Sequence, residues 1–266
     1  MKSIKRHISI YITYLKVMLQ TSMQYRFSFF IELFIEIGYI AWTLAFIYVV
    51  FGNITEVGGW NYHEMLVLIG VFTIFSETIM GLFFIWNLRL LPEKIKNGTI
   101  DFTLLKPINS QFILTAGNTY ISSFFATIPG MFLIWYGISN LEFTFSVVNS
   151  IAALIVFICG VIIIYAIMTI ISSLAFVLTN AQGLPRLVVD LYQFGQYPPT
   201  IYKNIPKFIF TFIFPVVFIA GIPSDIFLHG LNIPNVLLSI VVAIAFLYGS
   251  IWVWKQMISH YSSASS

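Results

Sequence analysis

The sequence predicts an all-α integral membrane protein with six transmembrane helices. Of its 266 residues, 59% are hydrophobic and 18% aromatic, and the mean hydropathy is +0.93. Only 9% are charged, against about 25% in an ordinary soluble domain. So few charges cannot cover the surface of a soluble fold with this much apolar area.

The spans are predicted where apolar runs reach the roughly 20 residues that cross the hydrocarbon as a helix. Unbroken apolar runs favour helices over the alternating strands of a barrel. Five such runs occupy residues 27–51, 65–88, 112–136, 147–178 and 235–254.

Positive charge indicates the orientation of these spans. Five of the Lys and Arg residues precede the first span, four fall within residues 89–111, and Lys255 follows the last span. The loops 52–64, 137–146 and 223–234 contain none. By the positive-inside rule, both termini and residues 89–111 are expected in the cytoplasm.

Residues 179–222 admit two arrangements, each of which completes six spans. In the first, residues 179–206 form a cytoplasmic loop and the shorter apolar run 207–222 is the fifth span. This arrangement places all 13 Lys and Arg residues on the inner side.

The second arrangement makes residues 181–197 the fifth span. Residues 198–222 then dip back into the membrane as a proline-interrupted re-entrant hairpin. Lys203 and Lys207 would lie on the outer side.

The N-terminal residues 1–26 predict an amphipathic helix at the inner membrane interface. Apolar residues recur every three or four positions from Ile4 to Met23, with cations between them. Such a helix places its cations near anionic headgroups. A membrane anchor and a partner-binding helix both fit this pattern.

A second short helix is predicted in the cytoplasmic segment 89–111. Pro92 suits the first turn of a helix and Gly98 suits its C-terminal cap. Pro107 marks a break before the third span. A solvated connector would have the same composition.

Three carboxylates fall inside the first two predicted spans. Glu32 and Glu36 lie one turn apart on one face of the first span, and Glu77 lies in the second. Burying a carboxylate in mid-membrane costs roughly 3 kcal/mol or more, so such groups face a cavity or a partner. Glu36 and Glu77 are candidates for a pathway that attracts cations, and a structural role is the alternative.

No catalytic chemistry is visible in the sequence. It contains no GxxxxGK[ST] phosphate-binding loop, no metal-ligand spacing and no set of catalytic residues outside the spans. Its scattered cations give no case for nucleic acid. An enzyme is therefore not predicted, and neither are catalytic or metal-binding residues.

Two segments resemble the bacterial ABC-2-type exporter permeases. The first is IKNGTIDFTLLKPINSQF (95–112), in which a basic helix, a Gly and an acidic residue precede Leu-Leu, a cation and Pro. The second is the proline- and aromatic-rich YPPTIYKNIPKFIFTFIFPVVFIAGIPSDIFLHG (197–230). The resemblance covers essentially the whole chain.

The resemblance implies the membrane subunit of an ATP-driven exporter in a bacterial cytoplasmic membrane. It would pair with a second permease, identical or homologous, around a pathway for a lipophilic, drug-like or lipid-like compound. ATP and Mg would be bound by separate ATP-binding subunits, and no cofactor by this chain. The resemblance also favours the re-entrant arrangement of residues 198–222.

Roles for individual residues follow from the same resemblance. Residues 89–111 would form the coupling segment, which an ATPase subunit contacts through Glu93, Lys94, Lys96, Gly98, Asp101, Leu105, Lys106 and Pro107. The outer gate would contain Tyr197, Pro198, Pro199 and Pro215.

Two other functions are compatible with the composition. A stand-alone secondary transporter or channel, driven by an ion gradient, would show broken spans related by an internal repeat. An integral-membrane enzyme acting on lipids would show polar catalytic residues gathered at one interface. Neither feature is seen in the sequence.

Overall fold

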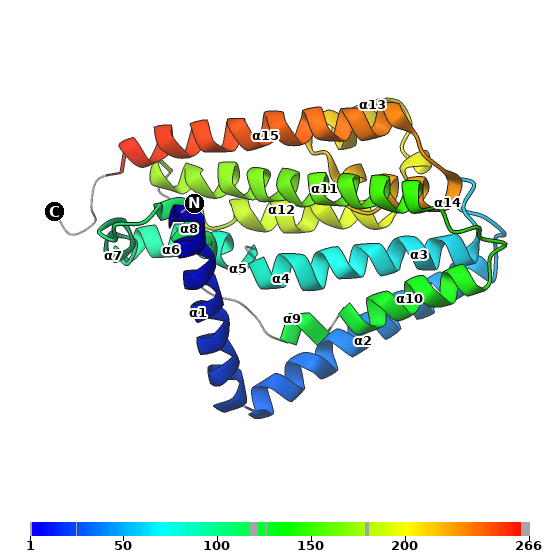
Figure 1. Ribbon diagram of the computed structural model, residues 1–266, viewed down its shortest axis with the longest axis horizontal. Helices are drawn as coiled ribbons and strands as arrows, with labels where there is room; N and C mark the ends of the chain where they lie inside the picture. Colours follow the sequence, from blue (N-terminus) through cyan, green and yellow to red (C-terminus); the bar gives the residue numbers. More distant parts are fainter. Residues whose placement is uncertain are drawn as a thin grey trace.

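A computed structural model describes residues 2–24, 26–83, 85–116, 122–125, 127–178 and 181–261, and within these the protein is helical (Figure 1). The extended backbone described there includes one isolated bridge, between Val57 and Trp60. The all-α prediction is therefore confirmed.

Among the described residues, three long apolar helices run lengthwise through the molecule (Figure 1). The first combines α3 (Tyr62–Thr73) with the π-helical turn η1 (Ile74–Ile79), the second combines α11 (Val147–Ser173) with η2 (Leu174–Phe176), and the third is α15 (Ile233–Ser259). Each is long and apolar enough to cross a membrane. The protein is a membrane protein.

Polar caps fix where the long helices begin. The side chain of Asn61 accepts hydrogen bonds from the N–H groups of His63 and Glu64, and Glu64 accepts one from the N–H of Asn61. At the start of α11 and α15, the side chains of Ser146 and Asn232 each accept one hydrogen bond, from the N–H groups of Asn149 and Asn235. These contacts satisfy amide groups that the first helical turn leaves unpaired.

The described residues of the other predicted spans are also mainly helical. Residues 27–51 lie in α2 (Arg26–Phe51), which is helical but has few contacts with the long helices. Residues 112–136 include α8 (Ser110–Ala116), α9 (Ser122–Phe125) and α10 (Thr127–Ser139), and residues 117–121 and 126 between them lie outside the described residues. Residues 181–197 hold α12 (Leu184–Tyr192) and the single turn η3 (Gln193–Gln196).

The second predicted span begins earlier and is less regular than expected. After α3 and η1, the chain continues as α4 (Met80–Phe83) and α5 (Ile85–Arg89). The beginning of this span packs closely on α10, since a Cβ at Gly70 would overlap the carbonyl of Gly130. Small residues let two apolar helices approach in this way.

Residues 198–222 fold back near one end of the long helices. They comprise η4 (Pro199–Ile201), α13 (Asn204–Phe208), the π-helical turn η5 (Ile209–Ile213), η6 (Val216–Phe218) and the start of α14 (Gly221–His229). The apolar helix Asn204–Ile213 has ten residues, or about 15 Å of helix. That is half the roughly 30 Å of a bilayer core.

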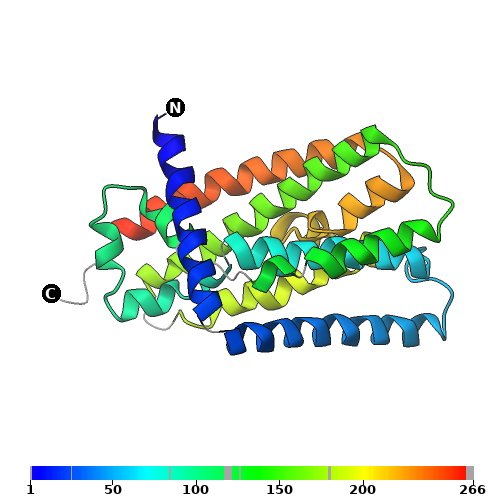
Figure 2. The ribbon, with the colours of Figure 1, turned by 60° about the horizontal axis from the view of Figure 1, so that its bottom comes forward.

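The N-terminal helix α1 (Lys2–Gln24) crosses the direction of the long helices at a steep angle (Figures 1 and 2). Its predicted helical structure is confirmed. His7 packs edge-on against Phe112 of α8, with ring centroids 4.5 Å apart. A helix in this orientation would lie along a membrane surface if the long helices cross it.

Candidate functional site

The segment between the second and third predicted spans forms one end of the molecule, which we call the α7 end (Figure 1). It contains α6 (Leu91–Lys96) and α7 (Asp101–Leu104). Pro92 lies in the first turn of α6, and Gly98 follows the helix with φ of 68°. Glycine adopts this left-handed conformation without steric cost. The short helix and its glycine cap are as predicted.

A small apolar core fixes this segment to the ends of the long helices. Leu91 and Ile100 are fully buried, and they cluster with Leu114, Phe176 and Trp254. Phe176 follows α11, and Trp254 lies near the end of α15. Packed side chains therefore connect α6 and the start of α7 to both helices.

A hydrogen bond connects α7 to the C-terminal end of the described chain. The hydroxyl of Tyr261 donates to Oδ1 of Asp101 over 2.9 Å. The ring of Tyr261 also packs edge-on against Phe176, with centroids 5.7 Å apart. Asp101 thus orients α7 from within this protein.

Two large apolar side chains project from α7 and its C-terminal cap. Phe102 is 73% exposed and Leu105 is 82% exposed. Glu93, Lys96, Lys106 and Pro107 around them are exposed as well. Apolar side chains within a polar, exposed surface indicate a protein contact. Leu105 is one of the predicted coupling residues, and Phe102 is not among them.

Lys94 differs from the other cations of the segment. Its side chain is half-buried, and this burial lowers the pKa of its ammonium group. The backbone carbonyl of Lys94 accepts hydrogen bonds from Ile100 N–H and from Thr99 Oγ1. These bonds close the turn around Gly98.

Glu77 lies midway along the molecule, in the π-helical turn η1. Oγ of Ser76 donates to Oε1 of Glu77 over 3.2 Å. The carboxylate also lies near enough to Tyr39 of α2 and Tyr192 of α12 to interact with them electrostatically. Glu36 lies in α2 three positions before Tyr39, but its side chain is outside the described residues. Whether the two carboxylates share one cavity therefore stays a prediction.

The opposite end, which we call the hairpin end, contains the predicted gate residues. Pro198 and Pro215 are buried, and Tyr197 and Pro199 are partly buried. The stretch after Pro215 packs so closely on α11 that a Cβ at Gly160 would overlap the carbonyl of Phe218. The prolines therefore lie within a packed structure.

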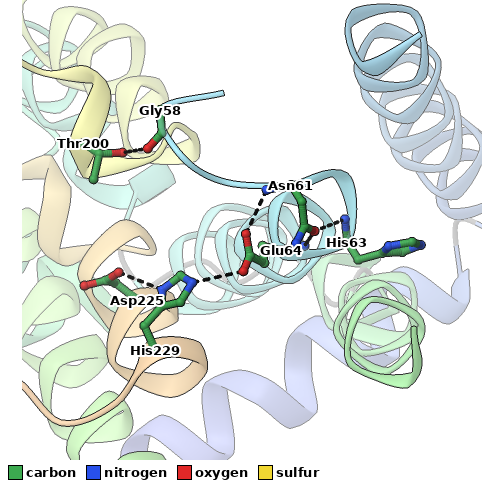
Figure 3. Close-up of polar contacts among 7 residues, drawn as sticks. All are labelled: Gly58, Asn61, His63, Glu64, Thr200, Asp225 and His229. Atoms are coloured by element: carbon green, nitrogen blue, oxygen red, sulfur yellow. Dashed lines mark hydrogen bonds and ion pairs between the residues drawn. The ribbon is translucent and has the colours of Figure 1, made fainter. Parts of the chain in front are cut away.

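A cluster of polar residues joins three elements at the hairpin end (Figure 3). His229 of α14 contacts Asp225 through Nδ1 and Glu64 of α3 through Nε2, both at 3.0 Å. Nearby, Thr200 Oγ1 donates to the carbonyl of Gly58 over 2.6 Å. These bonds connect α14, η4 and the turn before α3.

Both ring nitrogens of His229 face carboxylates, and a carboxylate only accepts hydrogen bonds. The doubly protonated imidazolium satisfies both contacts. Burial lowers the pKa of His229, but the bonds to Glu64 and Asp225 outweigh it and raise the pKa overall. Residues 57–64 and 225–229 are too far apart in sequence for this cluster to be predicted.

A family model described as ABC-2 family transporter protein matches residues 37–265, most of the chain. The chain belongs to the ABC-2 transporter family. The resemblance found in the sequence is thereby confirmed. Neither the curated proteins nor the solved structures gave a match.

ABC-2 membership concerns the membrane component of a transporter, a class that is typically not catalytic. The match includes both the α7 end and the hairpin end, but not α1 or the first part of α2. It names no substrate. The roles of individual residues in this ABC-2 protein are therefore argued from the geometry alone.

Proposed function

We propose that this protein is the permease subunit of an ATP-driven exporter and that its α7 end binds a separate ATP-binding subunit. The observation that carries this proposal is the exposed pair Phe102 and Leu105 on a segment fixed by a buried core. A segment that passes a conformational change from an ATPase to the spans needs a surface that binds the ATPase. It also needs a rigid connection to the helices that move.

The proposed topology has six spans with both termini in the cytoplasm. The spans are α2, the run from α3 to α5, the run from α8 to α10, α11, α12 with η3, and α15. The distribution of Lys and Arg supports this orientation, with the α7 end inside. The hairpin end, including residues 198–222, then faces the outside, and α1 lies along the inner surface.

In the proposed mechanism, ATP binding closes the ATPase pair and displaces α6 and α7. The apolar core around Leu91 and Ile100 passes this displacement to α11 and α15, while α5 and α8 follow by chain connection. A second permease, identical or homologous, completes the pathway. The hairpin ends of the two permeases form its outer gate.

The cargo we propose is a lipophilic drug-like or lipid-like compound. Glu77, held next to Tyr39 and Tyr192, supplies a carboxylate in mid-membrane that favours a cationic cargo. The pathway in this proposal also includes Glu36, which precedes Tyr39 by three positions in α2.

Purification from the native host in mild detergent tests the partner. We expect a soluble protein with a phosphate-binding loop to co-purify in stoichiometric amount, together with a second permease chain if the pair is heteromeric. A protein that purifies alone, with transport driven by an ion gradient and not by ATP, would contradict the proposal and indicate a secondary carrier.

Coupling is tested by replacing Gly98 with Val and Asp101 with Asn. Val is strained at a φ of 68°, and Asn leaves Tyr261 without its charged acceptor. Both variants should insert normally and permit ATP hydrolysis but lose export. Wild-type export by both variants would exclude a coupling role for α7.

A further inference from the structure

The hairpin end contains a cavity of about 500 Å³ between the hairpin, α14 and the start of α15. Cavities of this size accommodate a small organic ligand. The elements that line it, α13 and α14, lie at the opposite end of the molecule from α7 (Figure 1). No residue of the coupling segment lines the cavity.

The polar groups of this cavity include one cation and one carboxylate. Lys207 of α13 and Asp225 of α14 both line it, together with the amides of Asn204 and Asn235. Among the described residues, Lys207 forms no ion pair. Asp225 uses Oδ1 to contact His229, and no partner of Oδ2 is found in the described part of the chain. Each charge therefore retains capacity for a ligand group of opposite sign.

The remaining wall is apolar and continues to the protein surface. Phe212, Val217 and Leu238 line the cavity, as does Phe208, which is 57% exposed. In a membrane protein such a wall is suited to hydrocarbon chains. The cavity thus combines two opposite charges with an apolar side.

We infer that this cavity binds the zwitterionic headgroup of a phospholipid, with its phosphate at Lys207, its ammonium at Asp225 and its acyl chains along Phe208 and Phe212. Lysine binds phosphate as a point charge, and the two asparagine amides add neutral donors. An anionic lipid would lack the partner for Asp225, and a cationic lipid would meet Lys207. A headgroup with both charges matches both sites.

The binding test uses the purified full-length protein in detergent and three acyl-labelled probes. These are phosphatidylethanolamine, phosphatidylglycerol and a diacyl trimethylammonium lipid, titrated by fluorescence anisotropy. We expect phosphatidylethanolamine to bind about tenfold more tightly than either of the others, which corresponds to one lost charge contact. Equal affinity for all three lipids would overturn the inference.

Variants locate the site. Lys207→Gln should weaken phosphatidylethanolamine binding about tenfold, whereas Lys203→Gln, on the same segment but outside the cavity lining, should leave it unchanged. Lys207→Glu should reverse the preference toward the cationic lipid. Equal losses for Lys207→Gln and Lys203→Gln would overturn the assignment, as would a Lys207→Glu variant that keeps the wild-type preference.

Asp225 needs a separate control because it also contacts His229. Asp225→Asn should weaken binding of phosphatidylethanolamine, whereas His229→Gln should not, since His229 does not line the cavity. Equal weakening by both variants would assign the effect to the packing of α14 and contradict a role for Asp225 in binding.

Free phosphoethanolamine distinguishes a lipid from a soluble zwitterion. Without acyl chains it should compete only weakly with the labelled lipid. If it competes as well as unlabelled phosphatidylethanolamine does, the apolar wall contributes nothing and the occupant is not a lipid.

Discussion

The two ends of this molecule are built in opposite ways. At the α7 end, a buried apolar core supports a surface whose two largest side chains, Phe102 and Leu105, are exposed. At the hairpin end, the predicted gate prolines Pro198, Pro199 and Pro215 are partly or fully buried, and His229 contacts both Glu64 and Asp225. The first end is suited to contact with another protein, and the second is suited to holding itself closed.

The largest predicted effect is a loss of stability at the hairpin end when Gly160 is substituted. Gly160→Leu places a side chain where the carbonyl of Phe218 lies, so the hairpin must move away from α11. Overpacking of this kind costs about 1–3 kcal/mol, and backbone cannot yield as a side chain can. We expect a large loss of thermal stability, measured by tryptophan fluorescence in detergent.

The matched control for this variant is Gly249→Leu. Gly249 also lies in a long helix, α15, but a Cβ there meets no atom within 4 Å. Its melting temperature should stay near that of the wild type. Equal destabilisation by the two variants would show that the close contact at Gly160 is not what holds the hairpin.

Substitutions at the α7 end should weaken binding of the partner without loss of thermal stability. Phe102→Ala and Leu105→Ala each remove an exposed apolar side chain and should weaken binding of the ATP-binding subunit about tenfold or more. Lys255→Gln, an exposed change at the same end, is the control. Retention of the partner by both alanine variants, measured by pull-down, would contradict the proposed contact.

A substitution at Glu77, between the two ends, tests whether its carboxylate belongs to the transport pathway. Glu77→Gln removes the mid-membrane charge but keeps a hydrogen-bond acceptor for Ser76. Export of cationic compounds should fall several-fold more than export of neutral ones, as measured with radiolabelled substrates in vesicles. Equal effects on both classes would mean that the carboxylate is structural.

The smallest predicted effect is a pH dependence confined to the hairpin end. The pKa of His229 is raised above its ordinary value of 6.5 by Glu64 and Asp225, although burial opposes this. The contacts of protonated His229 therefore stabilise the folded protein fully below about pH 6.5, and this stabilisation is lost as pH rises through the raised pKa. The difference in melting temperature between wild type and His229→Gln should shrink over that interval.

His63→Gln is the control for this measurement, since it removes a neighbouring histidine for which no carboxylate partner is found among the described residues. If the difference in melting temperature between wild type and His229→Gln stays constant across the pH range, protonated His229 does not stabilise the hairpin end.

The sequence could predict what depends on local pattern. The helix from Leu91 to Lys96, its cap at Gly98 and the amphipathic α1 all follow from residue spacing within a few turns. The exposure of Phe102 could not be predicted, because it depends on how the core around Ile100 orients α7.

The features that escaped prediction depend on contacts between distant segments. His229 and Glu64 lie 165 positions apart, and the Tyr261–Asp101 bond joins residues 160 positions apart. The π-helical turn Ile74–Ile79 in the second predicted span and the ten-residue length of Asn204–Ile213 also differ from simple apolar runs. Hydropathy measures composition, and it does not register where a π-helical turn or a proline redirects the chain.

Cys159, in the middle of α11, has one further consequence. It is the only cysteine of the chain and its thiol is buried, so a water-soluble maleimide should not reach it in the folded protein. A cysteine introduced at Leu105 or at Thr200, both exposed, would then carry the only accessible thiol. Labelling intact cells and inverted vesicles with such variants assigns each end of the molecule to a side of the membrane, without altering the native background.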